Sequence, residues 1–155
     1  MEGYLIRVAE ARDTRVIAGQ RAAMFRDMGI LSPEEHERLV DDSEQWIAGL
    51  LADRRYAGWL VEHKNVVVAG GGILIREWMP VPQCCRVGLW AHIANVYTDP
   101  KHRRRGLARR LMTTMLDWCA SQRIDHVTLA ASSEGRPLYE SLGFTPTSEM
   151  KLSRP

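Results

Sequence analysis

Residues 96–112 read VYTDPKHRRRGLARRLM, and they join a predicted strand to a predicted helix through a turn at Pro100. The strand covers Leu89–Thr98, and the helix covers Gly106–Ser121. One apolar stripe along this helix is formed by Leu107, Leu111, Met115 and Trp118. Because these residues recur at helical spacing, the segment predicts a strand, a tight turn and an amphipathic helix that packs on a sheet.

The start of this helix has the chemistry of an anion site. A helix leaves about four backbone N–H groups without internal partners at its first turn, and its dipole places positive charge there. Gly106 and Ala108 are small, so a phosphate can approach the backbone closely. The decade 101–110 holds six basic residues and no acid: Lys101, Arg103, Arg104, Arg105, Arg109 and Arg110.

The charge balance of the chain supports a localised anion site. The 155 residues contain 21 basic and 19 acidic side chains, so outside 101–110 the balance is 15 to 19. A nucleic-acid-binding protein usually spreads positive charge over one face of the molecule. Because of the basic segment 101–110, nucleic-acid binding is still an alternative function. A Walker motif is absent because no Gly-Lys-Ser/Thr follows the turn.

The order of elements predicts an α/β (α+β) fold with a mixed central sheet flanked by helices, in the order β-α-α-β-β-β-α-β-α-β. The chain fits one domain, 1–155. The predicted strands are Tyr4–Ala9, Tyr56–His63, Val66–Trp78, Leu89–Thr98, His126–Ala131 and Glu149–Leu152. The predicted helices are Asp13–Met28, Ser32–Arg54, Gly106–Ser121 and Gly135–Leu142. The glycines at 70–72 lie inside a strand and indicate a bulge or a close approach of another backbone.

Other features of the composition exclude several classes. No apolar run approaches the roughly 20 residues of a membrane span, and residues 1–12 lack the apolar core of a signal peptide. The three cysteines, with Cys84 and Cys85 adjacent in the loop 79–87, match neither a disulfide framework nor zinc-ligand spacing. We therefore expect a cytoplasmic protein without a metal or a membrane partner.

A second motif supports the first. Residues 138–144 read LYESLGF, and they begin 30 residues after Ala108. With Arg103, Gly106 and Ala108 in the diagnostic places, the two motifs resemble those of the GNAT superfamily of acetyl-CoA-dependent N-acetyltransferases. The resemblance spans nearly the whole chain and implies acetyl-CoA as the co-substrate and an amine-bearing small molecule or peptide as the acceptor. Dimers are common in the family, so a homodimer is one expected state, and nucleic acid is not an expected partner.

The resemblance also implies a coenzyme site. In the family, the strand before the motif splays at a bulge and pairs with pantetheine, and the helix start binds pyrophosphate. One of three arginines, 103 to 105, would reach the 3′-phosphate. The implied coenzyme residues are Val96, Tyr97, Thr98, Arg103, Arg104, Arg105, Gly106, Leu107, Ala108, Arg109, Ser132 and Tyr139. Ser132 stands where the family often has Asn, so this position departs from the pattern.

The same resemblance implies catalytic roles. The N–H group of Val96 would donate to the thioester oxygen, and Tyr139 would protonate the departing sulfur. Asn95 is a candidate for positioning a water, while Glu77 and His92 are the titratable candidates for a general base. No cysteine or serine elbow lies near the motif, so we expect direct attack in a ternary complex rather than an acyl-enzyme. A module that binds coenzyme A without turnover is the alternative.

The acceptor side is expected from the first two helices and the loop 79–87. Trp46, Trp59, Trp78 and Met79 are candidates for lining an apolar cleft, although residues at helix or strand spacing belong to the core more often than to a pocket.

Overall fold

The computed structural model describes residues 3–82, 84 and 87–154, so Cys85 and part of the predicted loop 79–87 lie outside the described residues. The strands are β1 (Tyr4–Val8), β2 (Tyr56–His63), β3 (Val66–Glu77), β4 (Leu89–Thr98) and β5 (Val127–Leu129). The α-helices are α1 (Thr14–Asp27), α2 (His36–Ala52), α3 (Leu107–Ser121) and α4 (Arg136–Ser141). Short 3-10 turns, at Ala11–Asp13, Pro33–Glu35 and Pro100–His102, precede α1, α2 and α3.

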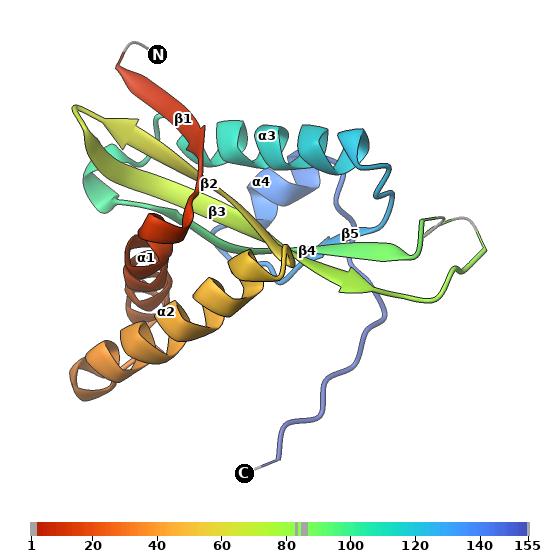
Figure 1. The fold of residues 1–155 in the computed structure, drawn as a ribbon, viewed down its shortest axis with the longest axis horizontal. Coiled ribbons are helices and arrows are strands. Elements are labelled where there is room, and N and C mark those ends of the chain that lie inside the picture. Colours follow the sequence, from red (N-terminus) through yellow and green to blue (C-terminus); the bar gives the residue numbers. More distant parts are fainter. Residues whose placement is uncertain (1–2, 83, 85–86, 155) are drawn as a thin grey trace.

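The described strands form one mixed sheet in the order β1-β2-β3-β4-β5 (Figure 1). Strands β1 to β4 pair antiparallel with their neighbours, whereas β5 lies parallel to β4. A parallel pair needs a crossover connection, and α3 supplies it between β4 and β5. The predicted fold class, a mixed sheet flanked by helices, is confirmed.

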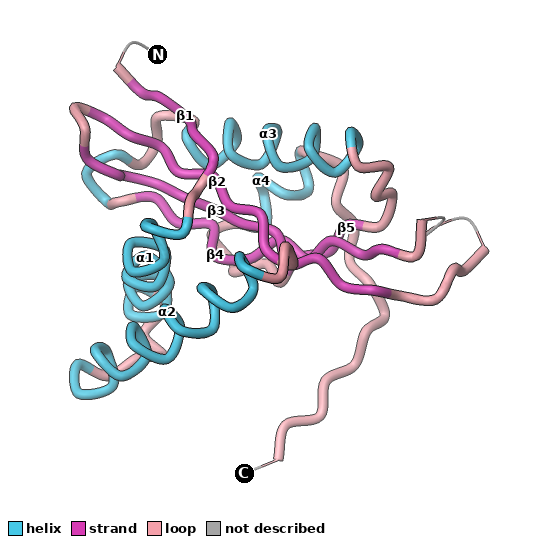
Figure 2. The backbone as a smooth tube through the Cα atoms, viewed as in Figure 1, coloured by secondary structure: helices cyan, strands magenta, loops and turns pink. Residues whose placement is uncertain are grey.

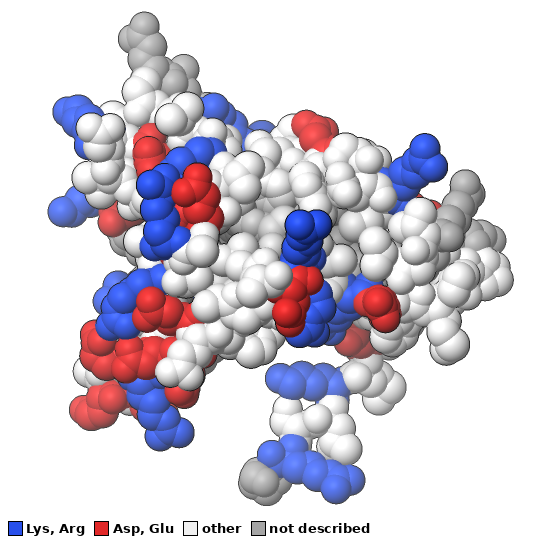
Figure 3. All heavy atoms as spheres, viewed as in Figure 1, with Lys and Arg blue, Asp and Glu red and all other residues white. Residues whose placement is uncertain are grey.

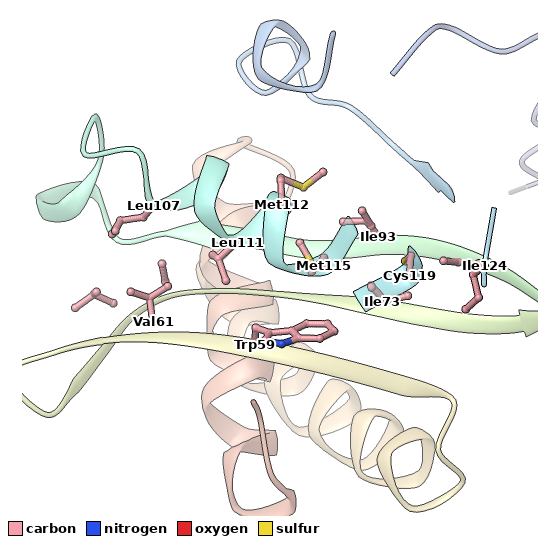
Figure 4. Close-up of a cluster of buried hydrophobic side chains, with 13 residues drawn as sticks. Trp59, Val61, Ile73, Ile93, Leu107, Leu111, Met112, Met115, Cys119 and Ile124 are labelled. Atoms are coloured by element: carbon pink, nitrogen blue, oxygen red, sulfur yellow. The ribbon is translucent and has the colours of Figure 1, made fainter. Parts of the chain in front are cut away.

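Helices cover both faces of the sheet. Figure 1 shows α3 and α4 on one face and α1 and α2 on the other. On the α3 face, the buried side of α3 packs against the strands, and Figure 4 shows these side chains meeting Trp59 of β2 and Ile73 of β3. The fully enclosed residues of α3 are Leu107, Leu111, Met112, Met115 and Cys119. This packing fixes the first turn of α3 against the sheet, because Leu107 is itself only 2% exposed.

A second core lies between α1, α2 and the opposite face. Ile17, Ala18 and Ala22 of α1 pack with Val40 and Ile47 of α2 over the sheet. At the rim, Arg15 of α1 makes ion pairs with three carboxylates of α2, those of Glu37, Asp41 and Glu44. On the face shown in Figure 3, acidic and basic side chains are interspersed over the α1 and α2 end. The two helices therefore form one layer, in which α1 rests on β3 and β4 and α2 rests on β2.

Several turns and helix ends follow from the residues at those positions. Lys64 and Asn65 form a two-residue hairpin turn, and both have positive φ (51° and 63°), as a type I′ turn requires. Ser32 and Glu35 form a capping box before α2. Gly29 ends the α1 segment at φ 72°, in the left-handed conformation that glycine adopts without strain.

The predicted last strand, Glu149–Leu152, is wrong. Residues 144–154 form no strand or helix, and Figure 2 shows them as an extended loop. Met150 and Leu152 are 94% and 79% exposed, so the alternating apolar pattern of this segment buries nothing. Alternation shows only that a segment has an apolar face, and a strand also needs a neighbour whose edge is free. Strand β5 is likewise shorter than the predicted His126–Ala131.

Candidate active site

A β-bulge interrupts β4 near its end. Ala94 pairs with Gly72 and Tyr97 pairs with Gly70, so Asn95 and Val96 together oppose the single residue Gly71. Asn95 takes up the extra length in the left-handed region, at φ 59°, where Asn is among the best-tolerated residues. The bulge predicted from the glycines at 70–72 is confirmed, and the extra residue belongs to the strand that faces them.

The glycines opposite the bulge also allow close packing from the α1 side. A Cβ atom at Gly72 would overlap the hydroxyl of Tyr56, and one at Gly70 would overlap the amide oxygen of Gln20 on α1. The missing side chains therefore let the Tyr56 ring and α1 lie directly on β3. This packing brings α1 within reach of Asn95.

Beyond the bulge, β4 has an open edge. Its pairing with β5 ends at Ile93 and Leu129, and within the described part of the chain no strand follows along residues 94–98 on that side. An exposed strand edge offers backbone N–H and C=O groups to another extended chain. Val96, Tyr97 and Thr98 lie on this segment, as the predicted site requires.

The open edge leads into the first turn of α3. Thr98 is followed by the Pro100–His102 turn, and Asp99 holds this turn by accepting a hydrogen bond from the Lys101 N–H at 2.9 Å. Arg104 (φ 61°) and Gly106 (φ 72°) are left-handed, which turns the chain sharply before the helix begins.

The amide groups at this turn are available to a ligand. The first helical bond of α3 runs from the Arg110 N–H to the Gly106 carbonyl at 3.1 Å. The N–H groups of Leu107, Ala108 and Arg109 precede it and have no acceptor within the helix. Donors of this kind, with the positive end of the helix dipole behind them, are suited to a phosphate.

The arginines around this turn differ in what they contact. Arg103 is held away from the turn, because its guanidinium pairs with Asp27 at the end of α1 and its Nε donates to the Thr98 carbonyl at 3.0 Å. Arg109 donates to Ser141 of α4 at 2.7 Å. Arg104 and Arg105 are exposed, and no carboxylate of the described residues pairs with either. Of the three arginines proposed for a distal phosphate, Arg104 and Arg105 are therefore the free ones.

Tyr139 lies on α4, which packs on the α3 side of the sheet. Its ring is half-buried and makes an edge contact with Phe144, with 6.2 Å between ring centroids. Burial raises the pKa of its hydroxyl, so this group is protonated at neutral pH. Gly135 lies against the ring, since a Cβ there would come within 2.8 Å of it. Ser132 holds the start of this segment, because its Oγ accepts a hydrogen bond from the Gly135 N–H at 3.1 Å.

The two candidate bases lie at different distances from the bulge. Glu77 ends β3, six residues beyond Gly71, which is about 20 Å at the rise of a β-strand. This separation disfavours Glu77 as the base. His92 lies on β4 three residues before Asn95, with its Nδ1 2.9 Å from the Thr128 hydroxyl. Burial, followed by the charge of Arg76, lowers the His92 pKa, so its imidazole is neutral at pH 7.

Asn95 has a partner that the sequence analysis did not identify. Arg21 of α1 donates from Nη1 to Asn95 Oδ1 at 2.8 Å, and its Cζ lies 4.7 Å from the centre of the Phe25 ring. Asn95 itself is 5% exposed, and its side chain also forms a hydrogen bond with the Tyr56 hydroxyl, so both contacts restrict its proposed role of positioning a water. The two residues are 74 positions apart, and no local motif connects them.

The aromatic candidates for an acceptor cleft separate into two groups. Trp59 is 5% exposed and belongs to the α3-side core. Trp46 and Trp78 are about half exposed, and Met79 is 79% exposed. Core packing is therefore the role of Trp59, whereas the other three lie at the surface.

None of the described helices is long and apolar enough to cross a membrane. Across residues 3–82, 84 and 87–154, no three His, Cys, Asp or Glu side chains are grouped so that they could hold a metal ion. Cys119 is a buried thiol, and burial raises its pKa to about 11.

Known proteins share both the sequence and the fold of this chain. Residues 21–144 match the model of the acetyltransferase (GNAT) family. A GCN5-related N-acetyltransferase from Ralstonia eutropha JMP134 is 32% identical, with 98% of this chain and 99% of that chain covered and a TM-score of 0.90. A predicted acetyltransferase with acetyl-CoA from Clostridium acetobutylicum is 24% identical, with 97% and 96% covered and a TM-score of 0.85.

A more distant neighbour has the same fold. Glucosamine-6-phosphate N-acetyltransferase from Arabidopsis thaliana is 20% identical, with 99% of this chain and 98% of that chain covered and a TM-score of 0.70. The comparison with curated proteins gave no match. The family match over residues 21–144, together with the 32% identity across nearly the whole chain, shows that this chain belongs to the GNAT acetyltransferase family and is an acyltransferase.

Proposed function

We propose that this chain transfers the acetyl group of acetyl-CoA to a primary amine by direct attack in a ternary complex. One observation carries the proposal: an open, bulged strand edge leads directly into a helix start with free amide donors. Coenzyme A has two amides in its pantetheine arm and a diphosphate behind them, so its parts follow the same order. The Clostridium acetobutylicum relative, whose structure is described as containing acetyl-CoA, supports this choice of co-substrate.

The coenzyme would be held mainly by the backbone. Val96, Tyr97 and Thr98 would pair with the pantetheine amides, and the N–H groups from Arg104 to Arg109 would surround the diphosphate. Arg104 or Arg105 would reach the 3′-phosphate, because Arg103 is committed to Asp27. Ser132 and Tyr139, on the α4 side, would complete the site next to Gly106, Leu107 and Ala108.

The reaction forms an amide and releases a thiol. The amine nitrogen attacks the thioester carbon, the C–S bond breaks, and the amine loses a proton to a base. The Val96 N–H would stabilise the negative oxygen that develops, an effect of about 2.7–4 kcal/mol where single oxyanion donors have been removed. An alkylamine with a pKa of about 10.4 is almost fully protonated at pH 7, so a proton acceptor is required.

His92 is the candidate proton acceptor in the described chain, directly or through water. Its imidazole is neutral at pH 7, and it lies on the same strand as the bulge. Asn95, held by Arg21 and by the Tyr56 hydroxyl, would orient a water between the amine and this base with its remaining hydrogen-bonding capacity. Glu77 is not carried forward, because about 20 Å of strand separates it from the bulge.

Tyr139 would protonate the departing sulfur. A phenol has a pKa of about 10 and a thiol about 8.5, and burial raises the Tyr139 pKa further, so full proton transfer is unfavourable. We therefore expect a hydrogen bond that shares the proton, with an effect of about 10²-fold, the low end for general acids.

The test is release of coenzyme A thiol from acetyl-CoA with a panel of primary amines, measured for the native chain and for Tyr139→Phe. We expect turnover with at least one amine, a fall of about 10²-fold in Tyr139→Phe, and a smaller change in coenzyme A affinity by calorimetry. Coenzyme binding without turnover on any amine would support a binding module instead. RNA or DNA affinity that survives saturating coenzyme A would support a nucleic-acid function, since the same donors would be occupied.

The acceptor class, the cellular location, the domain count and the oligomeric state stay predictions from the sequence. We expect the acceptor to be a small molecule or a peptide, the protein to act in the cytoplasm as one domain, and a homodimer to be one of its states.

A further inference from the structure

Arg21 is a cation in an unusual position. It lies on α1 and points toward the bulge of β4, half-buried between Asn95 and the face of the Phe25 ring. Burial lowers the pKa of Arg21, and the neighbouring Tyr56 hydroxyl partly opposes this shift. No carboxylate among residues 3–82, 84 and 87–154 lies within ion-pair distance of it.

Other arginines near this face are neutralised. Arg7 pairs with Asp13 and Glu62, and Arg103 pairs with Asp27. Removing a guanidinium from water costs free energy, and a carboxylate partner normally offsets that cost. Arg21 receives only one neutral amide oxygen and an aromatic face, so its environment compensates its charge incompletely.

Arg21 also has hydrogen-bonding capacity left. A guanidinium has five N–H donors in a fixed plane, and the bond to Asn95 uses one of them. The remaining donors suit an anionic group with two oxygens, such as a carboxylate or a phosphate, which a guanidinium can bind in a bidentate manner.

The location links this capacity to the reaction. Asn95, which Arg21 contacts, directly precedes Val96, whose N–H is the proposed oxyanion donor. Gly71 packs with Val96 and Met115 on the α3 side, whereas Asn95 reaches α1 on the other side. A group bound by Arg21 would therefore lie beside the acyl-transfer point, on the face opposite α3.

We propose that Arg21 binds an anionic oxygen group of the acceptor, a carboxylate or a phosphate a few bonds from the reacting amine. The inference rests on the proposed acetyl transfer and names the substrate class of the same site. Neutral or purely cationic acceptors, such as amides and polyamines, would be poor substrates because they leave the Arg21 charge uncompensated.

The test compares matched amines that differ in one charge. The panel contains α-amino acids, the corresponding amino-acid amides, an amino-sugar phosphate with its unphosphorylated sugar, and a polyamine. For the native chain we expect kcat/KM to favour an anionic acceptor over its neutral counterpart by about tenfold or more, the range of a hydrogen bond to a charged group. The amino-acid and sugar arms distinguish a carboxylate from a phosphate.

Variants then assign the preference to Arg21. Arg21→Gln should abolish this preference by lowering kcat/KM for the anionic acceptors about tenfold or more, and Arg21→Lys should retain part of it. Arg15→Gln, on the exposed side of the same helix, is the matched control and should change neither value. Equal preference in the native chain and Arg21→Gln, or a native chain without any preference for anionic acceptors, would overturn the proposal.

Binding gives a second readout that does not need turnover. With coenzyme A present, calorimetry should detect the preferred anionic amine on the native chain and at least tenfold weaker binding on Arg21→Gln, while coenzyme A affinity and far-UV circular dichroism stay unchanged. If no amine is acetylated but this difference persists, the proposed transfer fails and Arg21 remains an anion site. If amines are acetylated and the difference is absent, the anion site fails and the transfer stands.

Discussion

Substitution of Gly106 tests the proposed diphosphate site quantitatively, through the affinity for coenzyme A. The residue is left-handed, at φ 72°, at the start of α3. Among residues with a side chain, Asn and Asp tolerate this conformation best, so Gly106→Asn and Gly106→Asp should carry a similar backbone cost of about 1–2 kcal/mol. The two variants are nearly equal in size and differ by one negative charge, which isolates electrostatics from strain.

The size of the charge effect follows from Coulomb's law. Two unit charges 4 Å apart interact by about 1 kcal/mol in water and by about 4 kcal/mol at an effective dielectric constant of 20. The aspartate also opposes the roughly half positive charge at the helix start that would attract the diphosphate. We therefore expect Gly106→Asp to bind coenzyme A about 5-fold to about 10³-fold more weakly than Gly106→Asn.

Isothermal titration with coenzyme A measures this difference, and circular dichroism confirms that both variants are folded. The gap between them should narrow as salt rises from 0.1 M to 1 M, because the Debye length falls from about 10 Å to about 3 Å. Equal affinities of the Asp and Asn variants at low salt would refute a diphosphate at this helix start. A backbone-strain effect alone would lower both affinities together.

Two further predictions concern the sheet. Gly72→Ala should lower the free energy of unfolding by about 1–3 kcal/mol, because its Cβ would overlap the buried Tyr56 hydroxyl. The control Gly49→Ala, with open space around its Cβ on α2, should be neutral or stabilising by up to about 1 kcal/mol. Urea unfolding measures both variants, and an unchanged stability of Gly72→Ala would contradict the packing. If His92 accepts the amine proton, kcat/KM should fall as pH drops below about 6.5, because burial lowers the His92 pKa and activity needs the neutral ring. His92→Gln should remove this fall in kcat/KM at low pH. A fall that persists in the variant would assign the proton acceptor to another group.

The elements around residues 96–112 were predictable because local chemistry specifies them. Pro100 ends a strand, Gly106 supplies a left-handed residue before a helix, and the apolar stripe on that helix fixes which face is buried. The bulge was also predictable from the glycines at 70–72, since a strand without side chains is expected where the register or the packing changes. These features depend on residues within a few positions of one another.

Contacts between distant segments were not predictable in the same way. Arg103 fits the diagnostic place of a coenzyme motif, yet in the fold its guanidinium meets Asp27 at the end of α1. The Arg21–Asn95 contact depends on how α1 packs across β4, and the spacing of apolar residues in the sequence does not predict that packing. The segment 149–152 had the right alternation for a strand, but it pairs with none of the described strands. In each case a partner elsewhere in the chain decides the outcome.

The bulge explains why one strand can serve two ligands. Gly72 faces Tyr56, so its partner Ala94 points to the α1 side, and Asn95 also reaches that side through Arg21. In a regular strand these two neighbours would point to opposite faces, and the bulge instead directs both toward α1 before Val96 turns to α3. In the proposed site, the extra residue would leave the backbone edge to the coenzyme and direct a polar side chain toward the acceptor. Closing the bulge by deleting Asn95 should therefore impair acceptor recognition and coenzyme alignment together, since both depend on the same local departure from strand geometry.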